Sequence, residues 1–71
     1  MPNPTYGTAT YTYDGVKGLY TCNITVSGNT VDPTATKATG VGDTKYQAKR
    51  HAVVTYEKQN PLAFKNVPAD A

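Results

Sequence analysis

The chain has few of the residues that usually build a large core or a covalent framework. Its 71 residues include no Trp, one Phe, one Met and one Cys, and 38% of them are hydrophobic. A single cysteine excludes an internal disulfide framework, and a chain of this length has room for one domain, residues 1–71, with a modest core. No apolar run approaches the length of a membrane span or follows the first residue as in a signal peptide. We therefore expect one soluble domain in an intracellular compartment, cytoplasmic or nuclear, with no membrane partner.

Acidic residues are also scarce, and they are scattered. The five of them lie in turns, in the helix expected below and in the C-terminal tail, and no pair has the setting of a catalytic dyad or metal cluster. The single histidine, His51, has no second His or Cys with which to bind a metal. No phosphate-binding loop precedes a lysine. We expect no enzyme, no metal, no cofactor and no small-molecule substrate, whereas the net charge of +2 permits an anionic partner.

Alternating polar and apolar residues dominate the first half of the chain. After a lead-in rich in Pro and Gly, residues 1–7, which we expect to be irregular, two runs alternate strictly and are separated by turn residues. A third run is weaker, because Asp32-Pro33 interrupts it and proline cannot donate to a strand ladder. The pattern predicts three antiparallel strands, the last at a sheet edge or bulged at the proline: residues 8–13, 19–26 and 30–39.

The alternation also separates two faces of this sheet. Threonines and Asn23 share one face, while tyrosines and aliphatic residues share the other. On the apolar face Cys22 is most simply a buried core thiol, since no base accompanies it. We expect the core to use this face: Ala9, Tyr11, Tyr13, Tyr20, Cys22, Ile24 and Val26.

One convincing helix follows, over residues 44–58. Gly40 and Gly42 precede it and suggest a tight turn with positive φ. Thr44 is a suitable N-cap, because its hydroxyl can accept a hydrogen bond from an unpaired amide of the first turn. The sequence thus predicts an α+β fold in which a three-stranded antiparallel sheet is packed by one C-terminal helix, in the order β-β-β-α.

The faces of the helix differ in character. Ala48 and Ala52 form a stripe of small residues that would let the helix lie close to the apolar face of the sheet. Lys45, Lys49 and Arg50 lie near its start on another side. A helix start that is basic can read phosphate groups, although a solvated helix face with ordinary cations is the simpler interpretation of these three residues alone.

A resemblance to a known family favours the phosphate interpretation. The segment GVGDTKYQAKRHAVV resembles the second-helix signature of double-stranded RNA-binding domains, in which G-x-[ST]-K-K-x-A-K-x-x-A follows a strand end. Thr44, Lys45, Ala48, Lys49 and Ala52 fall on the expected places, and a hairpin followed by a third strand is similar to the family order over residues 8–58. The resemblance implies binding of double-stranded RNA by shape and by phosphate contacts.

The chain departs from the family in three ways. It has no sequence for the first helix, which in the family contacts an RNA minor groove; its first inter-strand loop is DGVKG, with Lys17 as the only cation; and Tyr46 replaces the middle lysine of the motif. Three or four cations offer little affinity at physiological salt. We therefore expect a single copy to bind RNA weakly through Lys45, Lys49, Arg50 and Lys17, with a homodimer restoring affinity by avidity.

The missing helix gives a separate reason to expect self-association. In the family fold it covers part of the sheet face, and here that part would be bare. Val53 and Val54 point about 100° apart and cannot both face the sheet, and Tyr46 shares a stripe with Val53. Either the tail, residues 60–71 with Leu62 and Phe64, or a second subunit would cover this partner face. Two functions stay open: binding of double-stranded RNA as a homodimer, and a protein-interaction module of the same fold that has lost RNA binding.

Overall fold

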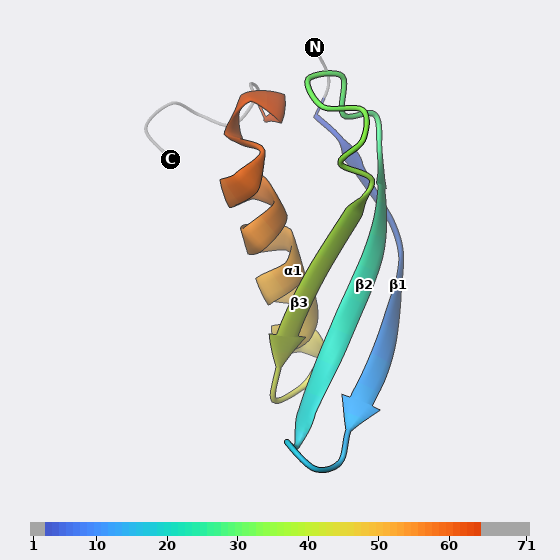
Figure 1. Cartoon of the computed structure of the whole chain (residues 1–71), viewed down its shortest axis with the longest axis vertical. Coiled ribbons are helices and arrows are strands. Elements are labelled where there is room, and N and C mark those ends of the chain that lie inside the picture. The colour runs from blue at the N-terminus through green and yellow to red at the C-terminus, as the bar shows by residue number, and fades with distance from the viewer. Residues whose placement is uncertain (1–2, 65–71) are drawn as a thin grey trace.

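The computed structural model describes residues 3–64, which form three strands followed by a helix (Figure 1). The strands are β1 (Thr5–Asp14), β2 (Leu19–Ser27) and β3 (Lys37–Gly42), and each pairs antiparallel with its neighbour in the order β1-β2-β3. The helix α1 (Lys45–Gln59) and a short 3₁₀ turn, η1 (Pro61–Ala63), complete the described chain. The expected α+β fold with β-β-β-α order is confirmed.

β1 begins earlier than its sequence suggests. Thr5 and Tyr6 already pair with Ser27 and Val26 of β2, and a bulge follows before Ala9 resumes the ladder. The prediction of an irregular lead-in up to residue 7 is therefore wrong for the last three of those residues. Tertiary contact explains the difference, because the Tyr6 ring packs edge-on against Tyr56 of α1 with centroids 6.0 Å apart.

β3 begins later than its sequence suggests. The segment predicted to start it at residue 30 is instead a loop that side chains hold together: Asn29 Oδ1 accepts the amides of Val31 (3.1 Å) and Asp32 (2.9 Å). Asp32 Oδ1 in turn accepts the amide of Thr34 at 3.1 Å. Polar side chains that accept hydrogen bonds from nearby amides compete with a strand ladder for the same donors. The pairing of β3 with β2 therefore begins only at Lys37.

Gly40 and Gly42 serve a purpose other than the predicted one. Among the described residues, positive φ occurs only at Gly18 (+67°) and Gly28 (+83°), so the expected left-handed turn at Gly40 and Gly42 is wrong. A Cβ added to Gly40 would lie 2.1 Å from the backbone nitrogen of Ala52, and one added to Gly42 would lie 2.6 Å from the nitrogen of Ala48. These glycines let the backbone of α1 rest directly on β3, and the alanines opposite them complete the close approach.

The core lies between α1 and the β2–β3 half of the sheet. Its buried members come from all the elements except β1: Cys22, Ile24, Val26, Ala38, Ala48, Ala52, Tyr56, Ala63 and Phe64. The helix packs mainly on β3 and less extensively on β2. The inner face of β1 is left at the margin, where Ala9, Tyr11 and Tyr20 of β2 are half-buried and Tyr13 is 57% exposed. The expectation that Tyr13 belongs to the core is wrong, because no helix lies above it.

The start of the tail packs back on the domain, as its apolar residues indicate. Phe64 is only 8% exposed and lies against Tyr6 and Tyr56, with ring centroids 6.4 and 6.0 Å away. Leu62 is 66% exposed. The remainder of the expected tail lies outside the described residues.

Candidate nucleic-acid interface

The start of α1 is fixed by the residues that the sequence indicates. Thr44 has extended backbone angles, and its hydroxyl accepts the amide of Gln47 at 3.1 Å, so it is the N-cap. The first turn of α1 contains no acidic residue. Unpaired amides and the helix dipole make this end partially positive, and Lys45, Lys49 and Arg50 add three full charges within the first two turns.

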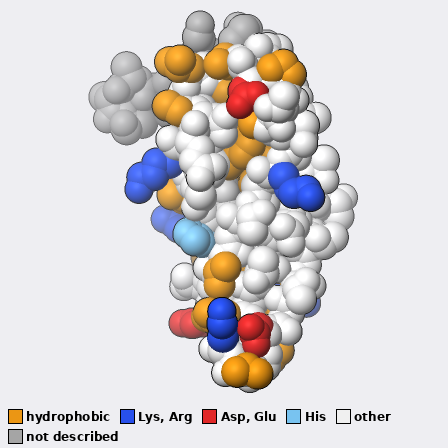
Figure 2. All heavy atoms as spheres, in the orientation of Figure 1, with side chains coloured by type: hydrophobic (Ala, Val, Ile, Leu, Met, Phe, Trp, Pro, Cys, Tyr) orange, Lys and Arg blue, Asp and Glu red, His pale blue; other side chains and the backbone are white. Residues whose placement is uncertain are grey.

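The turn between β1 and β2 lies at the same end of the molecule as the start of α1 (Figure 1). Asp14 shapes this turn, since its carboxylate accepts the amides of Val16 (3.0 Å) and Lys17 (3.2 Å). Lys17 is exposed there. The structure therefore brings Lys17 to the same end as the helix cations, although acidic side chains lie beside basic ones at that end (Figure 2).

One helix lysine, Lys45, reaches over the uncovered part of the sheet, and a second, Lys49, lies near the core. Lys45 Nζ lies 5.6 Å from the centre of the Tyr11 ring of β1, a cation–π contact. Lys49 lies near Cys22 of β2: burial raises the pKa of that thiol, and smaller effects of Tyr11 and Lys49 oppose the rise. Tyr11 therefore holds one cation above β1.

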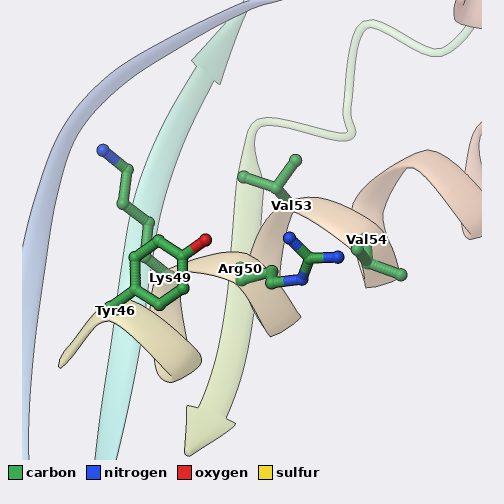
Figure 3. A pocket seen from close by; sticks show the side chains of 5 residues that line it. All are labelled: Tyr46, Lys49, Arg50, Val53 and Val54. Atoms are coloured by element: carbon green, nitrogen blue, oxygen red, sulfur yellow. The ribbon is translucent and has the colours of Figure 1, made fainter. Parts of the chain in front are cut away.

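The cations border an apolar hollow on the side of α1. Tyr46, Lys49, Arg50, Val53 and Val54 line a hollow of about 430 Å³, with the Lys49 and Arg50 side chains extending in different directions from the helix (Figure 3). Tyr46 is 69% exposed and Val54 49% exposed, whereas Val53 is half-buried against the core. The five residues follow helical spacing along one stripe, which would allow an aromatic or aliphatic group to lie between two positive charges.

The residues of the expected partner face do not all lie together. Tyr46, Val53 and Val54 share the stripe beside the hollow, but Phe64 is buried against Tyr6 and Tyr56 of its own chain. The 3₁₀ turn η1 that carries Leu62 follows the C-terminal end of α1, whereas the hollow begins at its first turn. The structure therefore reduces the accessible apolar stripe to three residues of α1.

The cations near the helix start have no acidic partners in the described part of the chain. Within residues 3–64, no carboxylate lies within ion-pair distance of Lys45, Lys49 or Arg50. Asp43 precedes the helix and is exposed. Within the described residues the three side chains are exposed, and Lys45 contacts the Tyr11 ring.

His51 has a role that the sequence does not reveal. Its Nδ1 accepts the backbone amide of Val41 in β3 at 2.9 Å. Because an amide can only donate, the neutral ring carries its proton on Nε2. Val41 lies on the outer edge of the sheet, so the imidazole occupies a backbone donor that another strand would otherwise use. A single histidine within a basic helical segment does not by itself indicate that its ring will contact a strand edge.

Residues 3–64 contain neither a metal-binding cluster nor a membrane-spanning helix. These residues contain no cluster of three or more His, Cys, Asp or Glu side chains that could hold a metal ion. None of their helices has both the length and the apolar character needed to span a membrane.

No family model, no curated protein and no solved structure matches the chain. The resemblance to double-stranded RNA-binding domains therefore rests on the helix-start motif and on the order of the strands and helix.

Proposed function

We propose that this domain binds double-stranded RNA by contacting phosphate groups with the start of α1. The observation that carries the proposal is the set of three exposed cations, Lys45, Lys49 and Arg50, which have no carboxylate partner within residues 3–64. They lie at the positive end of a capped helix whose first turn has no acidic residue. Lys17 projects from the turn at the same end and adds a fourth contact.

Shape supplies the preference for RNA over DNA in this proposal. The family that the chain resembles spans an A-form duplex by contacting successive minor grooves and the phosphates between them. Phosphate contacts alone carry no sequence information, so binding should be independent of sequence. With three to four phosphate contacts, the affinity should fall about 40-fold to 150-fold between 50 and 200 mM salt, from a slope of about −0.9 per contact.

A homodimer would strengthen such weak binding. Two linked helix starts bind one duplex with a high effective concentration, provided that both face the same side of the assembly. The uncovered inner face of β1 and the apolar stripe of α1 support self-association, since exposed apolar surface of this kind commonly marks an interface.

Paired lysine variants test the proposal. Replacing Lys45 and Lys49 by Ala should weaken binding to duplex RNA at least tenfold at low salt. It should also reduce the salt slope by about a half to two thirds, because two of the three to four contacts are lost. The matched control replaces Lys37 and Lys58 by Ala, which removes the same charge from the start of β3 and the end of α1. Equal weakening by both pairs, measured by fluorescence anisotropy, would show that only net charge matters and would refute the site.

The second candidate function is protein interaction without RNA binding. The hollow lined by Tyr46, Val53 and Val54 favours it, because two of these three apolar side chains are about half exposed or more. Under this alternative the Lys45→Ala, Lys49→Ala variant keeps its self-association unchanged, and neither it nor the parent chain binds RNA.

A further inference from the structure

The two edges of the sheet differ in how they are protected. The β3 edge is short, six residues, and begins with a lysine; His51 occupies its outward amide at Val41. The β1 edge is ten residues long, carries no charge before Asp14 and contains no proline. Charged side chains, prolines, short strands and covering groups are the usual means of preventing an edge from pairing with another chain. β3 has several of them, whereas β1 has one such device, the bulge between Tyr6 and Ala9, which precedes residues 9–14.

The register shows which backbone groups β1 presents at its free edge. The amide of Val26 in β2 donates to Thr36, so Val26 faces the β3 side of the sheet. Hydrogen-bonding direction alternates along an antiparallel strand. Thr21 and Asn23 therefore face β1, where their partners are Thr12 and Thr10.

It follows that the residues between these partners point their backbone groups away from the sheet. Ala9, Tyr11 and Tyr13 each have one N–H and one C=O directed outward. The outward amide of Val41 on β3, which is opposite Thr21, confirms the same alternation at the other edge. These β1 residues are also the ones whose side chains lie on the inner face that α1 does not cover.

We infer that the β1 edge pairs with the β1 edge of a second copy, antiparallel and with the twofold axis at Tyr11. In this register the outward groups of Ala9, Tyr11 and Tyr13 are all used, because Tyr11 lies opposite itself and Ala9 lies opposite Tyr13. A small residue then faces a large one. Asp14 lies opposite Thr8 rather than opposite a second Asp14, so no like charges meet.

The size of the surface agrees with a modest dimer. In this register residues 8–14 of the two strands overlap, a segment about 23 Å long. This edge, together with the Tyr11 and Tyr13 rings that meet across it, buries on the order of 500–600 Å² in each copy, near the lower limit for a specific interface. We therefore expect a weak dimer whose population depends on protein concentration.

The pairing has a geometric consequence. A twofold axis perpendicular to the sheet makes one six-stranded sheet and keeps both α1 helices on the same face. The two uncovered β1 half-faces become neighbours, and both basic helix starts are presented on one side. The inference does not depend on RNA binding, because it rests on the sheet edges alone.

Sedimentation equilibrium of the full chain between about 1 and 200 μM tests the pairing. Replacing Thr10 and Thr12 by Lys places two added charges on the exposed outer face of β1, where Thr10 of one copy lies opposite Thr12 of the other. The dissociation constant should rise at least tenfold. The matched control, Thr39→Lys with Val41→Lys, adds the same charges to the outer face of β3 and should leave it unchanged. A chain that is monomeric throughout, or a dimer insensitive to the β1 charges, would overturn the inference.

A cross-linking experiment tests the register independently of the lysine variants. Thr10→Cys with Thr12→Cys should give a disulfide-linked dimer on mild oxidation, because residues 10 and 12 lie opposite each other across the proposed pair. Thr39→Cys with Val41→Cys, oxidised in the same way, should remain monomeric on a non-reducing gel. Cys22 is fully buried and should not compete. A dimer that forms only when Tyr46 and Val54 of α1 are intact would place the interface on the helix and overturn the β1 register.

Discussion

Gly40→Ala should severely destabilise the domain, although it adds only one methyl group. In the structure an added Cβ at Gly40 would lie 2.1 Å from Ala52 N, 2.5 Å from Ala48 O and 2.6 Å from Ala52 Cα. All three are backbone atoms of α1, so no side chain can rotate away. To reach an ordinary contact of 3.4 Å from 2.1 Å, the helix and β3 must separate by about 1.3 Å.

The cost can be estimated from two opposing effects. Overpacking a tight interface costs about 1–3 kcal/mol, sometimes more, and a gap of ~1 Å along the rest of the interface forfeits a quarter to a half of each dispersion contact there. Ala restricts the unfolded chain more than Gly, which offsets about 0.4–1 kcal/mol. We expect a net loss of about 2–4 kcal/mol, a large part of the roughly 4–10 kcal/mol typical for a domain of this size.

Urea unfolding followed by circular dichroism would measure the loss. Gly15→Ala is the matched control, because the nearest atom to its added Cβ is a tyrosine ring carbon at 3.8 Å and its φ is not positive. The control should unfold within about 0.5 kcal/mol of the parent. If Gly40→Ala and Gly15→Ala unfold at the same urea concentration, the close approach of α1 to β3 does not exist as described.

Two further predictions concern tyrosines that link α1 to the strands and loops. Tyr56→Phe should cost about 1–3 kcal/mol in urea unfolding, because the Tyr56 hydroxyl accepts from buried Asn29 Nδ2 (2.8 Å) and donates to Ala35 O (2.6 Å). The result would be contradicted by an unchanged unfolding midpoint. Burial and the nearby Glu57 carboxylate raise the pKa of Tyr6 above its usual range, with the hydroxyl donating to Glu57 Oε2 at 3.2 Å. The unfolded chain then releases this proton near pH 10 while the folded chain keeps it, so stability should fall as pH rises above about 10. Tyr6→Phe should lose less stability between pH 9 and pH 11 than the parent, and an equal loss would contradict this origin.

Local signals in the sequence were sufficient for the helix and the hairpin. Thr44 caps the helix through a bond to an amide three residues away, and the alternation of β2 gives its buried face directly. Both depend on neighbouring residues, so they are readable without the tertiary structure. The stripe of Ala48 and Ala52 is confirmed for the same reason, since helical spacing fixes it.

Features that depend on distant residues could not be predicted in the same way. Tyr6 joins β1 because it packs on Tyr56, fifty residues away in the chain. Gly40 is required in β3 because the backbone of α1 lies directly against it. A pair of glycines before a helix indicates a turn as readily as a close approach. The contact between His51 and Val41 likewise requires the helix and the sheet edge to be in place.

The candidate site likewise combines features that neighbouring residues determine with features that depend on distant residues. The sequence names Lys45, Lys49 and Arg50, and the structure places them together near the capped helix start. The sequence pattern also predicts that Phe64 belongs to the partner face, whereas the structure buries this residue within its own chain. Whether a tail residue packs on its own domain is a tertiary property that its hydrophobicity alone does not decide.

The most direct test of phosphate binding by α1 is a fluorescence-anisotropy titration of the purified chain with a duplex RNA of about 20 base pairs, which covers one family footprint. A DNA duplex of the same sequence and length would be titrated alongside, at about 50 and 200 mM salt. If the start of α1 contacts RNA phosphates, binding should prefer RNA and weaken steeply with salt. Absence of binding at tens of micromolar, or equal binding to DNA, would contradict it.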